Sequence, residues 1–258
     1  MNLGLEGKRT LVLGGSQGLG RGIAAALAAE GASVAITSRD ASKATAAAGA
    51  IGKGVRGYAL DTGDLASVDA LWQAFASDHA GCDVLVLNSG GPPAGAARSV
   101  APDVWRKQFE AMFVGLVRIA DHALPGMIER RFGRIIILAS SGVVQPIANL
   151  AISNALRAAL VGWSKTLASE VAKDGVTVNV MIPGRIQTER VEELDAINAS
   201  HSNKPVDAIR AASVGRIPAG RYGNVDEFAS AAVYLASTAA SYTTGAMIRI
   251  DGGMIGSI

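Results

Sequence analysis

The chain has 258 residues, enough for one large domain, and it is 49% hydrophobic, 18% charged and 5% aromatic, with a net charge of +2. This composition is typical of a globular protein and argues against a nucleic-acid or anionic-membrane partner. The one cysteine, Cys82, excludes an internal disulfide framework. Because we find neither a signal peptide nor an apolar stretch near the ~20 residues that span a bilayer, we expect a cytoplasmic protein.

Strand and helix patterns alternate along the chain. The continuous apolar runs at 82–89 and 133–140 are typical of strands buried on both faces, which indicates a parallel sheet covered by helices. Because no linker or repeat interrupts the pattern, we predict a single α/β domain over 1–258, a Rossmann-type doubly wound fold with about seven parallel strands and helices on both faces. The strands are expected at 9–14, 33–38, 55–60, 82–89, 133–140, 176–182 and 245–251.

The segment 189–220 breaks this alternation. It is charged, helical in parts and bounded by a loop, whereas connections inside compact domains are usually short. We therefore interpret 189–220 as a possible lid over a substrate site.

A glycine cluster, LGGSQGLG at residues 13–20, follows the first expected strand and opens the first helix. A helix N-terminus presents unpaired N–H groups and a partial positive charge, and glycines let a diphosphate approach the backbone. The spacing of Gly14, Gly18 and Gly20 differs from the G-x-G-x-x-G form, so a simple tight turn is an alternative.

Two other positions favour a nucleotide site. Asn88 and Gly90 follow the fourth expected strand and would bracket a second backbone approach to a ligand. Asp61, at the end of the third expected strand, is placed to meet an adenine edge.

Together these residues resemble the short-chain dehydrogenase/reductase superfamily over practically the whole chain. Its TGxxxGxG loop matches the glycine cluster, its NNAG motif is present as LNSG at 87–90, and its N-x-x-x-PG element is present as NVMIPG at 179–184. Its C-terminal signature spans 220–253. The resemblance implies nicotinamide-dinucleotide binding. The residues expected at the cofactor are Gly14, Ser16, Gln17, Gly18, Leu19, Gly20, Ser38, Arg39, Asp61, Thr62, Asn88, Ser89, Gly90, Arg157, Pro183, Gly184, Ile186 and Thr188.

The end of the second expected strand bears on the choice of nucleotide. An acidic residue there would bind the ribose 2′-OH of NAD, whereas an arginine pairs with a 2′-phosphate. The sequence has Ser38 and Arg39 at this place, and Asp40 is interpreted as a cap of the next helix. We favour NADP(H) over NAD(H), with a solvated Arg39 that discriminates neither as the alternative.

The resemblance also assigns the catalytic positions, and three of the four are altered. The superfamily uses a serine after the fifth strand, a Tyr-x-x-x-Lys pair on the following helix and an asparagine on the preceding helix. The match of AALVGWSKTLASE puts Ser153 at the tyrosine position and Arg157 at the lysine position. The serine is expected to be Ser141, with Ser140 as the alternative, and Met112 occupies the asparagine position.

These replacements change the chemistry. A phenol has a reference pKa of ~10 that a nearby cation can lower, but the Ser153 hydroxyl is a far weaker acid. Arg157 can hold ribose hydroxyls but cannot pass a proton. Losing a general acid typically costs ~10²–10⁴ in rate, which hydride transfer could survive.

The sequence therefore supports two candidate functions. One is an NADP(H)-dependent oxidoreductase acting on a carbonyl or alcohol, similar to 3-oxoacyl reductases, in which Ser141 and Ser153 polarise the substrate oxygen, Arg157 holds the ribose and water supplies the proton. The other is a catalytically impaired nucleotide-binding or regulatory protein.

The remaining expectations concern partners. The resemblance implies a homotetramer and a small-molecule substrate. His79, His122 and His201 show no metal-ligand spacing, so no metal site is expected. Arg185 directly follows the PG turn and could contact an anionic substrate or lie on the surface.

Overall fold

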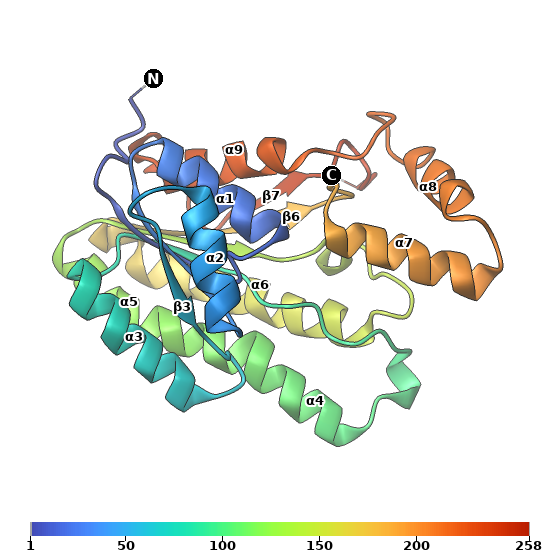
Figure 1. Ribbon diagram of the computed structural model, residues 1–258, viewed down its shortest axis with the longest axis horizontal. Helices are drawn as coiled ribbons and strands as arrows, with labels where there is room; N and C mark the ends of the chain where they lie inside the picture. The colour runs from blue at the N-terminus through green and yellow to red at the C-terminus, as the bar shows by residue number, and fades with distance from the viewer. Residues whose placement is uncertain (1, 258) are drawn as a thin grey trace.

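The computed structural model describes residues 2–257, which form one seven-stranded sheet between two layers of helices (Figure 1). The strand order is β3-β2-β1-β4-β5-β6-β7, and every neighbouring pair is parallel. This confirms the predicted doubly wound α/β fold. The strands are β1 Arg9–Val12, β2 Ser33–Ser38, β3 Arg56–Ala59, β4 Val84–Leu87, β5 Gly133–Leu138, β6 Val176–Pro183 and β7 Met247–Ile250.

Six helices cover the two faces of the sheet. Figure 1 shows α1 and α9 on one side and α3 and α5 on the other. Each layer buries its own apolar cluster against the strands, because a parallel sheet must be covered on both faces. The first layer contains α1 Gly18–Ala29, α2 Ala41–Ile51 and α9 Val225–Ala236; the second contains α3 Leu65–His79, α5 Gly115–Glu129 and α6 Ala151–Val171.

The other helical segments lie in the connections. Helix α4 Pro102–Phe109 continues through a π-helical turn, η2 Glu110–Val114, into α5. Helices α7 Glu189–Ser202 and α8 Val206–Val214 follow β6 and extend beyond one end of the sheet (Figure 1). Single 3-10 turns are η1 Ala97–Ser99, η3 Ser141–Val143, η4 Ala172–Asp174 and η5 Thr238–Ala240.

The continuous helical run Pro102–Glu129 corrects the expectation that no apolar stretch approaches the length of a membrane span. It is 28 residues long and contains a window with a mean hydropathy of 1.3, so by length and composition alone it could cross a membrane. Its inner residues Leu116, Ile119 and Ala123 are about 1% exposed or less and belong to the apolar cluster on the second face of the sheet. That packing is the behaviour of a core helix.

Local signals fix the ends of several elements. The carboxylate of Asp40 accepts the N–H groups of Ser42 and Lys43 at 2.8 and 3.1 Å, which confirms its predicted role as the cap of α2. Asn179 is 1% exposed and bridges the carbonyl of Thr243 and the N–H of Ala246, at 2.7 and 3.1 Å. The asparagine of the N-x-x-x-PG element therefore joins β6 to the turn before β7.

Asp83 forms a buried ionic cluster at the amino end of the sheet. Its side chain is 7% exposed and accepts hydrogen bonds from Arg9 at 2.6 and 2.7 Å and from Arg130 at 3.1 Å. Burial alone would raise the pKa of Asp83, but the hydrogen bonds and charges of the two guanidinium groups outweigh it and hold this pKa below its usual range. The cluster ties β1 and β4 to the end of α5.

We predict that Asp83→Asn lowers the free energy of unfolding by about 3 kcal/mol, because it leaves two guanidinium groups around a neutral amide. Urea unfolding at neutral pH measures this loss. As the pH falls through the lowered pKa of Asp83, the stabilisation of the wild type disappears, so the difference between the two proteins shrinks in acid. Asp69→Asn is the control, because that carboxylate pairs with Arg118 at the surface and should matter much less. Equal losses in both variants would contradict the prediction.

Candidate active site

The glycine loop connects β1 to α1 at the carboxyl end of the sheet. Gly14 and Gly18 have φ angles of 60° and 55°, a conformation that favours glycine. The N–H of Gly14 donates to Thr37 Oγ1 at 3.1 Å, and its carbonyl accepts Asn88 Nδ2 at 3.5 Å. A Cβ at Gly20 would lie 2.4 Å from the carbonyl oxygen of Gly14. The structure thus brings three predicted cofactor residues, Gly14, Gly20 and Asn88, into contact.

The first turn of α1 fits a diphosphate. The N-cap residue of α1 is Gln17, and its side chain forms no capping hydrogen bond within the described structure. The first turn of α1 contains no acidic residue. Uncapped N–H groups at a helix N-terminus attract phosphate oxygens. A Cβ at Gly18 would meet nothing closer than 3.9 Å, and one at Gly90 would meet nothing within 4 Å, so the backbone is open to a ligand at both positions.

The other predicted cofactor residues lie where strands end. Ser38 is the last residue of β2 and the exposed Arg39 follows it, and Ser89 follows β4 with its hydroxyl buried and without a partner in the described residues. Asp61 closes the turn before α3 by accepting the N–H of Gly63 at 2.9 Å, next to Thr62. The role of Asp61 at an adenine stays a prediction. The remaining positions lie in the glycine loop, at the end of β6 or just after it: Ser16, Gln17, Leu19, Pro183, Gly184, Ile186 and Thr188.

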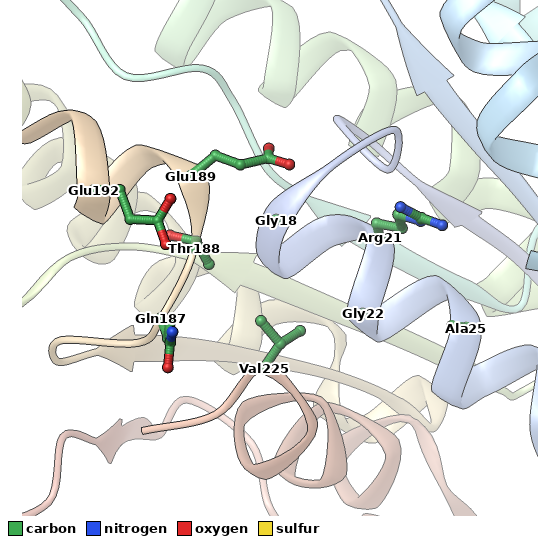
Figure 2. Close-up of a pocket in the computed structure, with 9 residues that line it drawn as sticks. All are labelled: Gly18, Arg21, Gly22, Ala25, Gln187, Thr188, Glu189, Glu192 and Val225. Atoms are coloured by element: carbon green, nitrogen blue, oxygen red, sulfur yellow. The ribbon is translucent and has the colours of Figure 1, made fainter. Parts of the chain in front are cut away.

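A pocket of about 380 Å³ lies beside the first turn of α1 (Figure 2). Gly18 and Thr188, two predicted cofactor residues, line it together, and Figure 2 shows the side chain of Glu189 reaching towards the glycine loop. Thr188 caps α7 by accepting the N–H of Val191 at 3.4 Å. The start of the expected lid therefore adjoins the glycine loop. The lining residues are Gly18, Arg21, Gly22, Ala25, Gln187, Thr188, Glu189, Glu192 and Val225.

Ser153 and Arg157 both lie on the inner face of α6, and their exposed fractions are 8% and 9%. The guanidinium of Arg157 donates through Nη1 to the carbonyl oxygen of Leu138, the last residue of β5, at 2.7 Å. Burial lowers the pKa of Arg157 to about 10. In the part of the chain that the structure describes, no carboxylate forms an ion pair with it. Arg157 is therefore a buried cation that is held only by a carbonyl group.

The two candidate serines follow β5 in the same turn. Ser141 is 8% exposed, whereas Ser140 is half-buried and its Oγ accepts the N–H of Gly142 at 3.1 Å. The Ser140 hydroxyl still has its own proton to donate. Ala139 separates the two serines from Leu138, so they lie just beyond the strand end that Arg157 contacts.

Met112 lies in the π-helical turn between α4 and α5 and is 1% exposed. It packs with Ile152 and Leu156 of α6 in a separate apolar cluster. A thioether in an apolar cluster offers no good hydrogen-bond partner to water, so position 112 cannot continue a proton relay. π-Helical turns are frequent at functional sites, although this one brings an apolar residue there.

Comparison with known proteins identifies the family of the chain. A family model described as enoyl-(acyl carrier protein) reductase matches residues 14–255. The 3-oxoacyl-(acyl-carrier-protein) reductase FabG of Vibrio harveyi is 35% identical over 254 residues, which are 98% of this chain and 99% of the relative. The chain belongs to the short-chain dehydrogenase/reductase superfamily.

Solved structures extend the comparison. L-sorbose reductase from Gluconobacter frateurii, complexed with NADPH and L-sorbose, is 32% identical with a TM-score of 0.94, and the match covers 100% of both chains. YwfH, an NADPH-dependent reductase involved in bacilysin biosynthesis, is 28% identical with a TM-score of 0.93, covering 98% of this chain and 100% of YwfH. The protein is thus an oxidoreductase of the superfamily by its sequence and its fold.

A buried network that involves the segment 189–220 was not found by reasoning from the sequence. Asp195 of α7 is 3% exposed, and it accepts hydrogen bonds from Arg185 at 3.1 Å and from the Tyr222 hydroxyl at 2.8 Å. Arg185, expected at a substrate or on the surface, instead anchors α7 to the end of β6. No spacing in the sequence signals this contact, because 27 residues separate Asp195 from Tyr222.

We predict that Gly20→Ala weakens NADPH binding at least about tenfold, because the new Cβ must push the first turn of α1 away from the carbonyl of Gly14. Titration of NADPH fluorescence measures the affinity, and circular dichroism checks the fold. Gly49→Ala on the exposed face of α2 is the control, since a Cβ there meets nothing within 4 Å. Unchanged NADPH affinity in Gly20→Ala would show that the loop does not bind the dinucleotide.

Proposed function

We propose that the chain is an NADP(H)-dependent oxidoreductase that interconverts a carbonyl compound and an alcohol, similar to 3-oxoacyl reductases, with an atypical active site. The observation that carries the proposal is that the glycine loop and the buried Ser153–Arg157 pair lie at the same edge of the sheet. The relative from Vibrio harveyi and the NADPH complex of L-sorbose reductase support it.

The chain's own residues would bind and orient the reactants. The uncapped first turn of α1, with Gly18 and Gly20, would bind the diphosphate, and Arg157 would hold the nicotinamide ribose. NADPH supplies a hydride when it is bound. Ser141, or its neighbour Ser140, would donate a hydrogen bond to the substrate oxygen. Ser153 takes the place of the usual tyrosine, and water delivers the proton.

The NADP(H) preference rests on the end of β2. The Asp40 carboxylate caps α2 through its Oδ1, which commits it to that helix, while Arg39 is exposed beside it. A guanidinium recognises a phosphate through paired, charge-assisted hydrogen bonds.

Arg39→Asp should therefore weaken NADPH binding about 10- to 100-fold and leave NADH binding unchanged or tighter, because it replaces the phosphate's partner with a like charge. Fluorescence titration with both nucleotides measures the ratio. Lys43→Ala removes another exposed charge from the first turn of α2 and is the control. If Arg39→Asp binds both nucleotides as the wild type does, the preference does not come from Arg39.

We also propose that 1–258 acts as one domain and that 189–220 forms a lid. Asp195 anchors the lid to Arg185, and a Cβ at Gly91 would lie 3.2 Å from a nitrogen of Arg190, so the lid reaches the loop after β4. We further propose a cytoplasmic homotetramer with a small-molecule substrate. Large apolar side chains exposed on the long helix and near the C-terminus support association: Phe109, Ile128, Tyr234, Tyr242 and Met247.

The proposed reaction is tested by the loss of NADPH absorbance with a panel of ketones and 3-oxoacyl thioesters. We expect sustained turnover that falls about 10²–10³-fold when the orienting hydroxyl is removed. Comparing Ser141→Ala with Ser140→Ala identifies which serine provides it. Micromolar NADPH binding without turnover of any compound would instead support the nucleotide-binding or regulatory function.

A further inference from the structure

Arg157 has no counter-ion among residues 2–257, which the structure describes. The Arg157 guanidinium is 9% exposed and has five N–H donors, of which one bonds to the Leu138 carbonyl at 2.7 Å. Burial is the only cause that shifts its pKa, so no acidic group of the described chain compensates its charge. An uncompensated buried charge is costly, and proteins usually supply such a group with an anion.

Two hydroxyl donors belong to the same edge of the sheet. Leu138 directly follows the pair Leu87↔Ile137 of β4 and β5, so the carbonyl that Arg157 contacts lies beside the turn after β4. Ser89 belongs to this turn, and its buried Oγ has no partner in the described residues. Ser153 lies one helical turn before Arg157 on the same buried face of α6. Arg157 and Ser89 therefore both have hydrogen-bonding capacity left at this edge.

The tyrosines of the chain do not supply the missing acid. Tyr58 donates its hydroxyl to Asp78 at 2.6 Å, and burial and that carboxylate raise the pKa of Tyr58 to about 12. Tyr222 donates to Asp195 at the lid, and Tyr234 and Tyr242 are exposed.

We propose that Arg157, Ser153 and Ser89 form an oxyanion site that stabilises an alkoxide, so that proton transfer follows hydride transfer instead of accompanying it. The hydride of NADPH forms a C–H bond with the carbonyl carbon, the C=O π electrons move to oxygen, and NADPH becomes NADP⁺. The alkoxide, paired with Arg157, then takes a proton from water and leaves hydroxide to the solvent. Fixed donors placed where negative charge develops stabilise it strongly in a buried site. This inference rests on the proposed carbonyl reduction.

The oxyanion site selects a class of substrate. Without a general acid, the alkoxide must persist long enough to meet water, so ketones whose alkoxides are weak bases react best. The substrates are therefore electron-poor ketones, in which a withdrawing group adjoins the carbonyl. We expect kcat/KM for trifluoromethyl phenyl ketone to be at least about 10²-fold higher than for methyl phenyl ketone. This factor is the lower end of what a general acid contributes to the rate.

The double variant Ser153→Tyr with Arg157→Lys tests the origin of that preference. It restores the phenol and ammonium of the superfamily pattern, so the ratio between the two ketones should fall about tenfold or more. Ser153→Ala should lower kcat/KM about 10²-fold. Ser164→Ala is the matched control, because Ser164 is also buried on α6 but already donates to the Val161 carbonyl. Equal rates of the wild type with both ketones would overturn the proposal.

A binding measurement separates this inference from the proposed function. Formate and acetate carry an anionic oxygen like that of the alkoxide, so they should raise the Tm of the wild type and of Arg157→Lys but not of Arg157→Met. Circular dichroism verifies that each variant is folded. If formate stabilises the wild type and Arg157→Met equally, Arg157 does not bind oxyanions and the inference fails, whether or not ketones are reduced. If the selective stabilisation is found but no ketone is reduced, the anion site stands and the proposed reduction fails.

Discussion

The site depends on the reversal of strand order between β1 and β4 in a sheet that is parallel throughout. Because parallel strands end at one edge, the loops after β1, β4 and β5 meet there, and the reversal is where such sheets bind ligands. The Asn88 side chain joins the loop after β4 to Gly14, and the contact between Gly20 and the Gly14 carbonyl sets the first turn of α1 against it. An uncapped helix N-terminus is thereby held open to a ligand.

The parts of this arrangement that follow local rules could be predicted from the sequence. Runs of apolar, often β-branched residues predicted the strands, and β2 was predicted at its observed bounds, Ser33–Ser38. The run at 82–89 was predicted too long, because β4 ends at Leu87 where Asn88 and Ser89 turn out of the sheet towards the site. Asn88 and Ser89 are polar residues typical of turns, so the end of the strand could have been placed after Leu87.

Contacts between distant segments could not be predicted. Threonine is common in strands, so the sequence does not signal that the Thr37 hydroxyl supports the glycine loop. Asp195 is one of several charged residues in 189–220, and the sequence does not show that it is buried. The sequence also cannot decide whether Ser140 or Ser141 is the orienting serine. The two are neighbours in a short turn, where no periodic pattern of apolar residues shows which side chain faces the site. The apolar run Pro102–Glu129 was underestimated because Arg and Asp residues interrupt it in the sequence without interrupting the helix.

If Arg157 takes the place of the superfamily's lysine, as we propose, its burial decides what the replacement does. A buried ammonium can lose its proton, whereas the guanidinium of Arg157 keeps its charge even with its pKa lowered to about 10. In the site that we propose, a permanent cation, serine in place of phenol and an apolar Met112 would weaken proton transfer but keep a strong electrostatic field at one place. Such a field favours negative charge on a bound oxygen. In this proposal, acid catalysis is weakened while electrostatic stabilisation by Arg157 remains, and both effects concern the same oxygen atom.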